Sequence, residues 1–241
     1  MRRLLGYFIV LVLFSCSDSP EIPMQDPFSG YFPLQTGTFQ LYAVEDIQIQ
    51  QNVQTRSVYE LKTSVVDSFK NEEGGYTFII NRYKRLDSTQ PWIALDTWSA
   101  RTTNRKVIVN EGTIPIVRLI LPLSKGQKWN GNEMNTLGGD DDCGSGVEFS
   151  CDQFEMGAIG EVFQTGNSSF ENTLTVMEEN DQDLLVKNDV RKKVYASGNG
   201  LVYMENTILN YCTSPPSCYG TQFVNMGIVY KQTLIESGFE K

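Results

Sequence analysis

The chain contains no histidine among its 241 residues. Histidine is the commonest general base of enzymes, and it is the proton acceptor in Ser-His-acid and Cys-His catalytic sites. Its absence also removes the usual nitrogen ligand of zinc sites. An enzyme with this sequence would depend on carboxylates, lysine or tyrosine, and we recognise no catalytic arrangement of these residues. The sequence therefore predicts a protein that is not an enzyme and that carries no cofactor.

The sequence also lacks a long hydrophobic run. The first apolar stretch spans residues 4–14, directly behind Arg2 and Arg3. A helix that crosses a bilayer needs about 20 apolar residues, so this stretch is too short to remain as an anchor. A short apolar core behind basic residues is typical of a secretion signal. We therefore expect the protein to be exported.

Cys16 follows this apolar stretch, behind the small residue Ser15. The arrangement resembles the bacterial lipobox, in which the signal is cleaved before a cysteine that carries a diacylglycerol and an N-acyl chain such as palmitate. The resemblance implies a lipoprotein signal peptide at residues 1–15 and membrane anchoring through acyl chains on Cys16. Ser17 is not the aspartate that retains many lipoproteins in an inner membrane, which favours the outer membrane of a cell envelope. The alternative is an ordinary signal peptide that is cleaved near Ser15.

Basic residues are fewer than acidic ones, with 20 Lys+Arg against 29 Asp+Glu and a formal net charge of −9. A negative surface disfavours binding to nucleic acid and to anionic lipid head groups. We therefore expect no nucleic-acid partner, and a membrane contact that depends on the N-terminal lipid. The sequence does not specify a protein or glycan partner.

Four further cysteines fall as two local pairs, Cys143 with Cys151 and Cys212 with Cys218. An even number fits an oxidising compartment, and four cysteines allow three connectivities. Local disulfides are favoured because each pair would close a short loop that is rich in glycine and aspartate or in proline. The spacing is not the CxxC pattern of zinc sites.

Residues 140–142 are three consecutive aspartates in a Gly-rich segment. Oxygen ligands on such a loop suit Ca²⁺, and Asp140 and Asp142 are the candidate ligands. Counted from Asp140, however, the fifth and twelfth positions of the EF-hand pattern are Gly144 and Cys151. The favoured interpretation is a solvated loop beside a disulfide, and we predict no metal site.

Beyond residue 30, short β-branched and aromatic runs alternate with turn residues, and no segment sustains a helical period. The pattern predicts an all-β fold: mainly an antiparallel meander in a curved sheet, open barrel or sandwich, with at most one or two short helices. The division into parts is a signal peptide at 1–15, a lipidated cysteine and flexible tether at 16–30, and a single β-rich domain at 31–241. The expected strands lie near residues 39–43, 55–69, 76–86, 91–102, 106–110, 113–121, 162–164, 170–177, 201–209 and 223–236.

Three segments depart from this regular pattern of strands. Pro115 lacks a backbone donor, so its strand is expected at an edge of the sheet or to start late. Residues 130–158 are rich in glycine, asparagine and aspartate and are expected to form a long loop. Residues 188–196 are compatible with a single helical turn or with a further strand.

Three short segments carry a family resemblance: YFPLQTG at 31–37, LPLSKGQKW at 121–129 and YASGNGLVY at 195–203. Together they resemble uncharacterised Bacteroidota outer-membrane lipoproteins of the Flavobacteria and Cytophaga type. The resemblance implies a cell-envelope location, on the periplasmic or the outer face of the outer membrane, and a β-sheet fold. It implies no reaction.

A local basic region, residues 82–85 followed by Arg101, Arg105 and Lys106, is unusual in an acidic protein. It could face an anionic ligand, but a solvated sheet face is the simpler interpretation. The tryptophans, such as Trp92 and Trp98, could stack on sugars or line an apolar cavity, and core packing is the simpler role for most of them.

These observations favour a membrane-anchored lipoprotein that is a non-catalytic binding or structural module. The alternative is a carrier that encloses an apolar ligand or lipid in a curved sheet, which would require a continuous apolar cavity of several hundred Å³. A carboxylate-based glycan hydrolase would require two carboxylates about 5–10 Å apart beside a cleft, and the sequence nominates no such pair.

Overall fold

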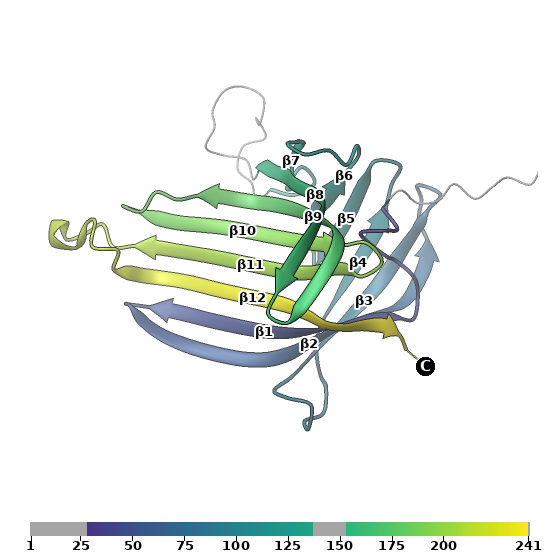
Figure 1. Cartoon of the computed structure of the whole chain (residues 1–241), viewed down its shortest axis with the longest axis horizontal. Helices are drawn as coiled ribbons and strands as arrows, with labels where there is room; N and C mark the ends of the chain where they lie inside the picture. Colours follow the sequence, from purple (N-terminus) through teal and green to yellow (C-terminus); the bar gives the residue numbers. More distant parts are fainter. Residues whose placement is uncertain (1–27, 137–152, 241) are drawn as a thin grey trace, which may run out of the picture.

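The computed structural model describes residues 28–136 and 153–240. Within them, 12 strands form one antiparallel sheet (Figure 1). Two meanders, β1 to β6 and β7 to β12, are joined where β1 pairs with β12, so the sheet runs from β6 at one edge to β7 at the other. The strands are β1 Thr38–Gln50, β2 Val53–Lys70, β3 Tyr76–Arg85, β4 Ile93–Thr102, β5 Lys106–Glu111, β6 Ile114–Ile120, β7 Lys128–Asn130, β8 Gln153–Thr165, β9 Ser168–Asp181, β10 Lys187–Ala196, β11 Gly200–Tyr211 and β12 Val224–Phe239, with one 3₁₀ turn at Pro216–Cys218. The all-β antiparallel prediction is confirmed.

The turns explain why the chain reverses so tightly. Gln51 and Asn52 form a two-residue connection between β1 and β2 with φ angles of 49° and 62°. Positive φ at both positions is the geometry that matches the twist of paired strands. Gly112, with φ of 65°, makes the corresponding reversal between β5 and β6. These local choices set the register of the long hairpins.

The sheet is curled until its two edges meet. In Figure 1, β10, β11, β12 and β1 run side by side across the view, whereas β3 to β6 rise steeply at one end. Beyond the ladders, the Val117 amide of β6 donates to the Gly131 carbonyl over 2.8 Å, just past the end of β7. The Trp129 indole of β7 donates to the Val117 carbonyl over 2.8 Å. Pro115 lies in β6, which is an edge strand of the sheet, as predicted.

The main core lies inside this curl. It consists of apolar side chains from both meanders, together with Phe28 from the chain ahead of β1. Burial of each such side chain contributes about 1.5–3 kcal/mol. Its fully buried members include Val107, Val117, Leu119, Met156, Leu174 and Val176.

The segment at residues 28–37, here called the strap, crosses the rim of the sheet before β1 begins. The Phe32 amide donates to the Phe28 carbonyl over 2.7 Å, and the Gly198 amide donates to the Gly30 carbonyl over 2.6 Å. Phe28 is fully buried. The strap is therefore anchored at its start by burial and along its length by a bond to the β10–β11 turn.

One expectation about local structure is wrong, and for residues 188–196 the structure shows which of the two open alternatives holds. Residues 153–158 were expected in a loop, but they belong to β8, where Phe154 and Met156 alternate into the core. Asn130, at the start of the same expected loop, ends β7. Residues 188–196 lie in β10 and form no helical turn. Lys193 to Ala196 are all buried because both faces of this part of the strand are covered, which hides the period-2 alternation of a strand.

Candidate ligand-binding site

The concave side of the curled sheet encloses a cavity of about 440 Å³. This volume lies within the usual range of ligand pockets, roughly 300–1,000 Å³. Its walls come from β1 to β6, from β10 to β12 and from the strap. The two meanders and the strap must therefore come together before the cavity exists.

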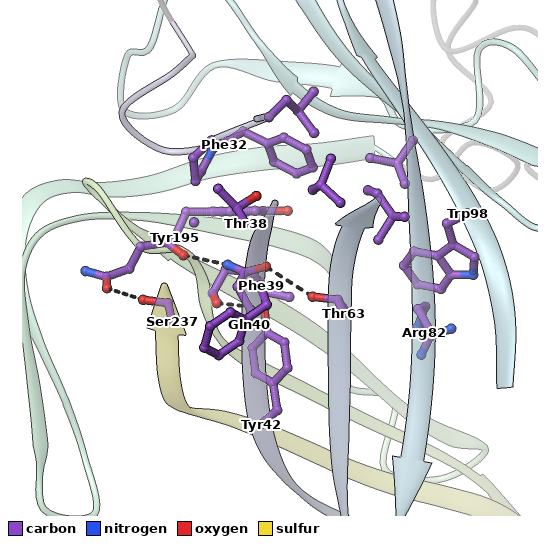
Figure 2. A pocket seen from close by; sticks show the side chains of 18 of the residues that line it. Phe32, Thr38, Phe39, Gln40, Tyr42, Thr63, Arg82, Trp98, Tyr195 and Ser237 are labelled. Atoms are coloured by element: carbon purple, nitrogen blue, oxygen red, sulfur yellow. Dashed lines mark hydrogen bonds between the residues drawn. The ribbon is translucent and has the colours of Figure 1, made fainter. Parts of the chain in front are cut away.

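Most of the wall is apolar. Leu61 and Val65 point into the cavity from β2, Ile80 from β3 and Trp98 from β4, and Figure 2 shows Trp98 on the side opposite Tyr195. An apolar wall of this extent favours ligands with hydrocarbon or aromatic surface. Its apolar and aromatic members are Phe32, Pro33, Leu34, Phe39, Tyr42, Leu61, Val65, Ile80, Trp98, Val109, Tyr195, Leu201, Met204 and Phe239.

The strap forms one wall through Phe32, Pro33 and Leu34. The Phe32 ring lies 6.2 Å from the ring of Tyr195, centroid to centroid. Pro33 approaches the start of β11 so closely that a Cβ atom on Gly200 would lie 3.1 Å from its Cδ atom. Gly200 also has φ of 77°, a conformation that favours glycine. This glycine allows the strap to lie against the sheet.

Polar side chains near the strap bond to one another. Gln40 donates from Nε2 to the Asn199 carbonyl over 2.5 Å, and its Oε1 atom accepts a long bond from Thr63 of 3.4 Å (Figure 2). Ser237 donates to Asn199 Oδ1 over 3.0 Å. These bonds join β1, β2 and β12 to the β10–β11 turn, so they hold the cavity walls in place.

Four charged side chains form a buried group, here called the charged cluster: Glu111 of β5, Arg118 of β6, Glu178 of β9 and Lys193 of β10. Arg118 donates to Glu178 over 2.6 Å and to Glu111, and Lys193 donates to both Glu178 oxygens over 2.6 and 2.8 Å. Arg118, Glu178 and Lys193 have only 7%, 6% and 6% of their side chains exposed. Buried charges are tolerated only when they are paired in this way. The cluster ties β5 and β6 to β9 and β10 across the curl.

The pKa values in the charged cluster follow from this pairing. Burial by itself would raise the pKa of Glu178, but the charges of Arg118 and Lys193 outweigh burial and hold it below its usual value of 4.5. Burial and the nearby Arg118 charge lower the pKa of Lys193, against the opposing effect of Glu178. Glu178 is therefore ionised at neutral pH.

Arg82 is a further cation in the cavity wall. Its guanidinium lies 3.9 Å from the centre of the Trp98 ring, and it donates to the two carboxylate oxygens of Asp96 over 2.9 and 3.2 Å. Its Nε atom is buried, and within residues 28–136 and 153–240 it has no hydrogen-bond partner. Arg82 therefore retains an unused donor beside the apolar wall.

Tyr42 is a buried tyrosine in the cavity wall. Its hydroxyl donates to the Leu201 carbonyl over 3.1 Å. Burial raises its pKa, the neighbouring Tyr195 and Tyr230 raise it further, and Arg82 acts in the opposite direction. Tyr195 in turn interacts with Arg118.

The residues of the basic region lie in different parts of the structure. Arg82 and Trp98 line the cavity, whereas Arg85 stacks on Trp92 at 4.1 Å outside its wall. Arg101 pairs with Glu73, and Lys106 pairs with Glu133. Only a small part of the predicted cationic patch therefore faces a possible ligand.

Sequence reasoning missed the charged cluster. Its members are spread from residue 111 to residue 193, in four separate strands. The only available signal was a charge at a position that should point inward, such as Lys193 next to the apolar run that follows it. That signal is too common in strands to identify a site without the strand pairing.

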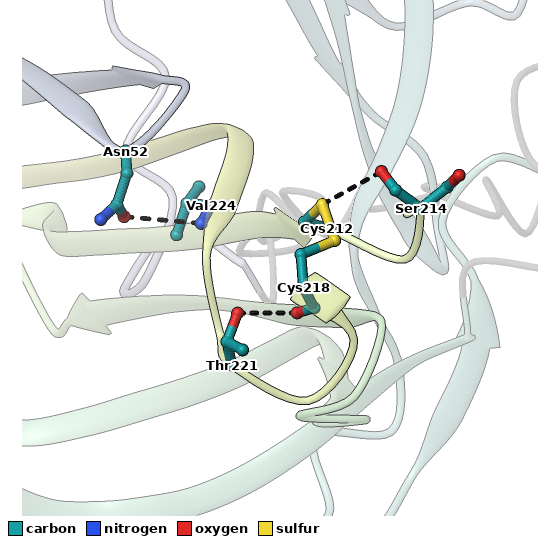
Figure 3. Close-up of a disulfide and its surroundings, with 6 residues drawn as sticks. All are labelled: Asn52, Cys212, Ser214, Cys218, Thr221 and Val224. Carbon is teal, nitrogen blue, oxygen red and sulfur yellow. Dashed lines mark hydrogen bonds between the residues drawn. A yellow bond between two sulfur atoms is a disulfide. The ribbon is translucent and has the colours of Figure 1, made fainter. Parts of the chain in front are cut away.

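Cys212 and Cys218 form a disulfide with a Cα–Cα distance of 5.7 Å, in the loop between β11 and β12 (Figure 3). Thr221 donates to the Cys218 carbonyl over 2.6 Å, and Val224 and Asn52 are bonded between the β12 start and the β1–β2 turn. The loop follows the end of β11, whereas the cavity is lined by the beginning of that strand. This crosslink is therefore separate from the cavity.

The other predicted site residues fall outside the described residues: Cys16, the pair Cys143 and Cys151, and the calcium candidates Asp140 and Asp142. In the described ranges, no group of His, Cys, Asp and Glu side chains is arranged to hold a metal ion. The same ranges contain no helix that is long and apolar enough to span a membrane.

No family model matches the chain, and no curated protein matches it in sequence. Among solved structures, it is similar to a Bacteroides fragilis protein described as exported, with a YmcC-like fold. The two share 12% identity with a TM-score of 0.42, over 87% of this chain and 99% of the other. A Parabacteroides distasonis protein described as a lipoprotein shares 10% identity with a TM-score of 0.44, over 87% of this chain and 98% of that one.

Proposed function

We propose that this chain is a lipid-anchored, non-catalytic binding protein of the cell envelope that holds an apolar small molecule inside its curled sheet. The observation that carries the proposal is the cavity of about 440 Å³ with its largely apolar wall. Protein interiors are close-packed and contain few voids larger than a water molecule. A purely structural module would gain stability by filling this space with larger side chains. The open space therefore favours the carrier over a structural module.

The carboxylates support a role without catalysis. A general acid needs a pKa raised toward the operating pH. The pKa of Glu178 is instead held below its usual value, since Arg118 and Lys193 outweigh the effect of burial. Glu111 is bonded to Arg118. Both carboxylates are thus engaged in holding the wall of the cavity.

The proposed anchor would keep the cavity close to a membrane. Eleven residues separate Cys16 from Phe28, where the strap begins. Even a fully extended chain of this length spans no more than roughly 40 Å. Because the strap is itself a wall of the cavity, an acylated Cys16 would place the binding site within that reach of the lipid surface. The protein would then be positioned to take up or deliver an apolar molecule at the bilayer.

Fluorescence titration with N-phenylnaphthylamine, a neutral apolar dye, tests the binding function. Thr63 lines the cavity from the middle of β2. A Thr63→Trp substitution fills the cavity, so we expect dye binding to weaken by about tenfold or more. Thr55→Trp is the matched control, because Thr55 lies on the same strand and is exposed.

Equal midpoints of thermal unfolding for the two variants would show that the loss does not come from unfolding. Should Thr63→Trp be unstable, Leu201→Phe fills the same space from β11 and serves as the second variant. A dye that does not bind the wild type, or that binds both tryptophan variants like the wild type, would contradict the proposed function.

A further inference from the structure

We infer that the ligand of this cavity is an amphiphile with an apolar chain and an anionic end group, and that Arg82 binds the anionic end. The inference rests on the proposed binding function and adds the chemical class of the ligand. Its basis is the distribution of charge around the cavity, which is uneven in a protein whose overall charge is negative.

The charged side chains that line the cavity are three cations, Arg82, Arg118 and Lys193, and one anion, Glu111. Each cation is hydrogen-bonded to a carboxylate, so the charges balance in total, but two of the three carboxylates do not line the cavity. Asp96, the partner of Arg82, and Glu178, the partner of Arg118 and Lys193, do not line the cavity. A ligand inside the cavity therefore meets the cationic side of these ion pairs. Since the surrounding wall is apolar and shields little, this orientation of the ion pairs favours an anion in the cavity.

Arg82 is the cation best prepared to bind a ligand. Arg118 and Lys193 direct hydrogen bonds to carboxylates of the charged cluster. Arg82, by contrast, bonds the one carboxylate Asp96 through Nη1, and its Nε atom has no partner in the described parts of the chain. The Trp98 ring, which also lines the cavity, and the Asp96 carboxylate hold the guanidinium in place. A fixed guanidinium with a free donor suits a carboxylate or phosphate oxygen.

Glu111 does not cancel this preference. Its carboxylate accepts a hydrogen bond from Arg118, so its charge is locally compensated. Tyr42 and Gln232 also line the cavity, but they interact with each other, and the Tyr42 hydroxyl already donates to the Leu201 carbonyl. The apolar chain would then extend along Leu61, Val65 and Ile80, toward the strap.

Competition titrations test the inference. Bound N-phenylnaphthylamine is displaced with decanoate, decan-1-ol or decylammonium, which share one chain length and differ in the charge of the end group. We expect decanoate to displace the dye at about tenfold lower concentration than decan-1-ol, because a charged hydrogen bond distinguishes them. Decylammonium should be the weakest competitor.

Two arginine variants then locate the anion site. Arg82→Gln should remove the preference of about tenfold for decanoate over decan-1-ol. Arg85→Gln is the matched control: Arg85 also pairs with a carboxylate, Glu60 at 2.6 Å, and also stacks on a tryptophan, but it does not line the cavity. Arg85→Gln should keep the preference.

The outcomes separate the two proposals. Equal displacement by decanoate and decan-1-ol, or the same loss in both arginine variants, would overturn the inference while leaving the binding function intact. Decyl phosphate in place of decanoate shows which anionic group is preferred, and an anion preference lost in Arg82→Gln with either group supports the inference. Absence of dye binding to the wild type would instead remove the proposed function on which the inference rests.

Discussion

Glu178 is the residue on which the buried charges depend most. It accepts hydrogen bonds from Arg118 and from Lys193, and it is nearly inaccessible to solvent. If its charge were lost, two buried cations would share only Glu111. Removing one member of a buried ion pair is far more destabilising than the net contribution of the pair, because the remaining charge is left uncompensated.

We therefore predict that Glu178→Gln lowers the free energy of unfolding by about 3–5 kcal/mol at neutral pH, measured by urea denaturation. The control is Glu45→Gln, which breaks the ion pair with Arg56, whose side chains are 36% and 63% exposed. An exposed pair of this kind contributes less than about 1 kcal/mol. Similar losses in the two variants would contradict the role given to the charged cluster.

The same experiment has a defined pH dependence. Burial alone would raise the pKa of Glu178, but Arg118 and Lys193 hold the pKa below its usual 4.5 in the folded protein. The stability that ionised Glu178 contributes is thus fully present above its pKa in the unfolded chain. It is lost as the pH falls through its pKa in the folded protein. The difference in free energy of unfolding between the wild type and Glu178→Gln should be constant from neutral pH to about pH 5, and it should become smaller below pH 5. A difference in free energy of unfolding that becomes larger in acid would show that folding raises the pKa of Glu178 instead of lowering it.

At the scale of elements, the strap completes the wall of the proposed binding site. It adds Phe32, Pro33 and Leu34 to the cavity wall. Its fit against the sheet depends on Gly200, where a Cβ atom would lie 2.6 Å from Gln40 Nε2 and 3.1 Å from Pro33 Cδ. Gln40 bonds the Asn199 carbonyl next to this glycine, so neither neighbour can move without loss.

Gly200→Ala should therefore destabilise the protein more than Gly198→Ala in the same turn. The two glycines have similar φ angles, 77° and 81°, so both alanines bear a left-handed conformation that costs about 1–2 kcal/mol. Nothing lies within 4 Å of a Cβ atom at Gly198, so only Gly200→Ala also meets a close contact. We expect an additional loss of about 1–3 kcal/mol in urea denaturation. Equal losses of free energy of unfolding in the two variants would mean that the strap is not in close contact with this turn.

The sequence predicted most strands because their alternation is local. The hairpin of β2 and β3 and the edge position of Pro115 follow from turn residues and from a missing backbone donor. β8 was missed at its start because it follows a long Gly- and Asp-rich segment, which concealed the alternation of Phe154 and Met156. β10 was ambiguous because it is buried on both faces near Lys193.

The candidate site was predictable only in part. An apolar cavity in a curved sheet followed as an alternative from the all-β pattern, and Arg82 and Trp98 were noted as members of a basic and an aromatic group. The cavity itself requires that β1 pair with β12, two strands at opposite ends of the described chain. No local pattern encodes that pairing, so the meeting of Arg118 with Glu178 could not be predicted either.

At the scale of the whole molecule, the proposed function follows from one sheet that curls around a space it does not fill. The closing contacts between the edges, from Val117 to Gly131 and Trp129, bring the two meanders together on one side. The strap adds a further wall to the cavity, and the charged cluster ties β5 and β6 to β9 and β10. The disulfide loop between β11 and β12 stands apart from this arrangement.

A crystal structure of the protein with ω-bromodecanoate tests the central claim most directly, because the bromine atom identifies the ligand by its anomalous scattering. The account predicts a bromine peak within the cavity, among Leu61, Val65 and Ile80, with the carboxylate at Arg82. A structure in which the ligand occupies only the outer surface of the sheet, with the cavity free of it, would contradict the account.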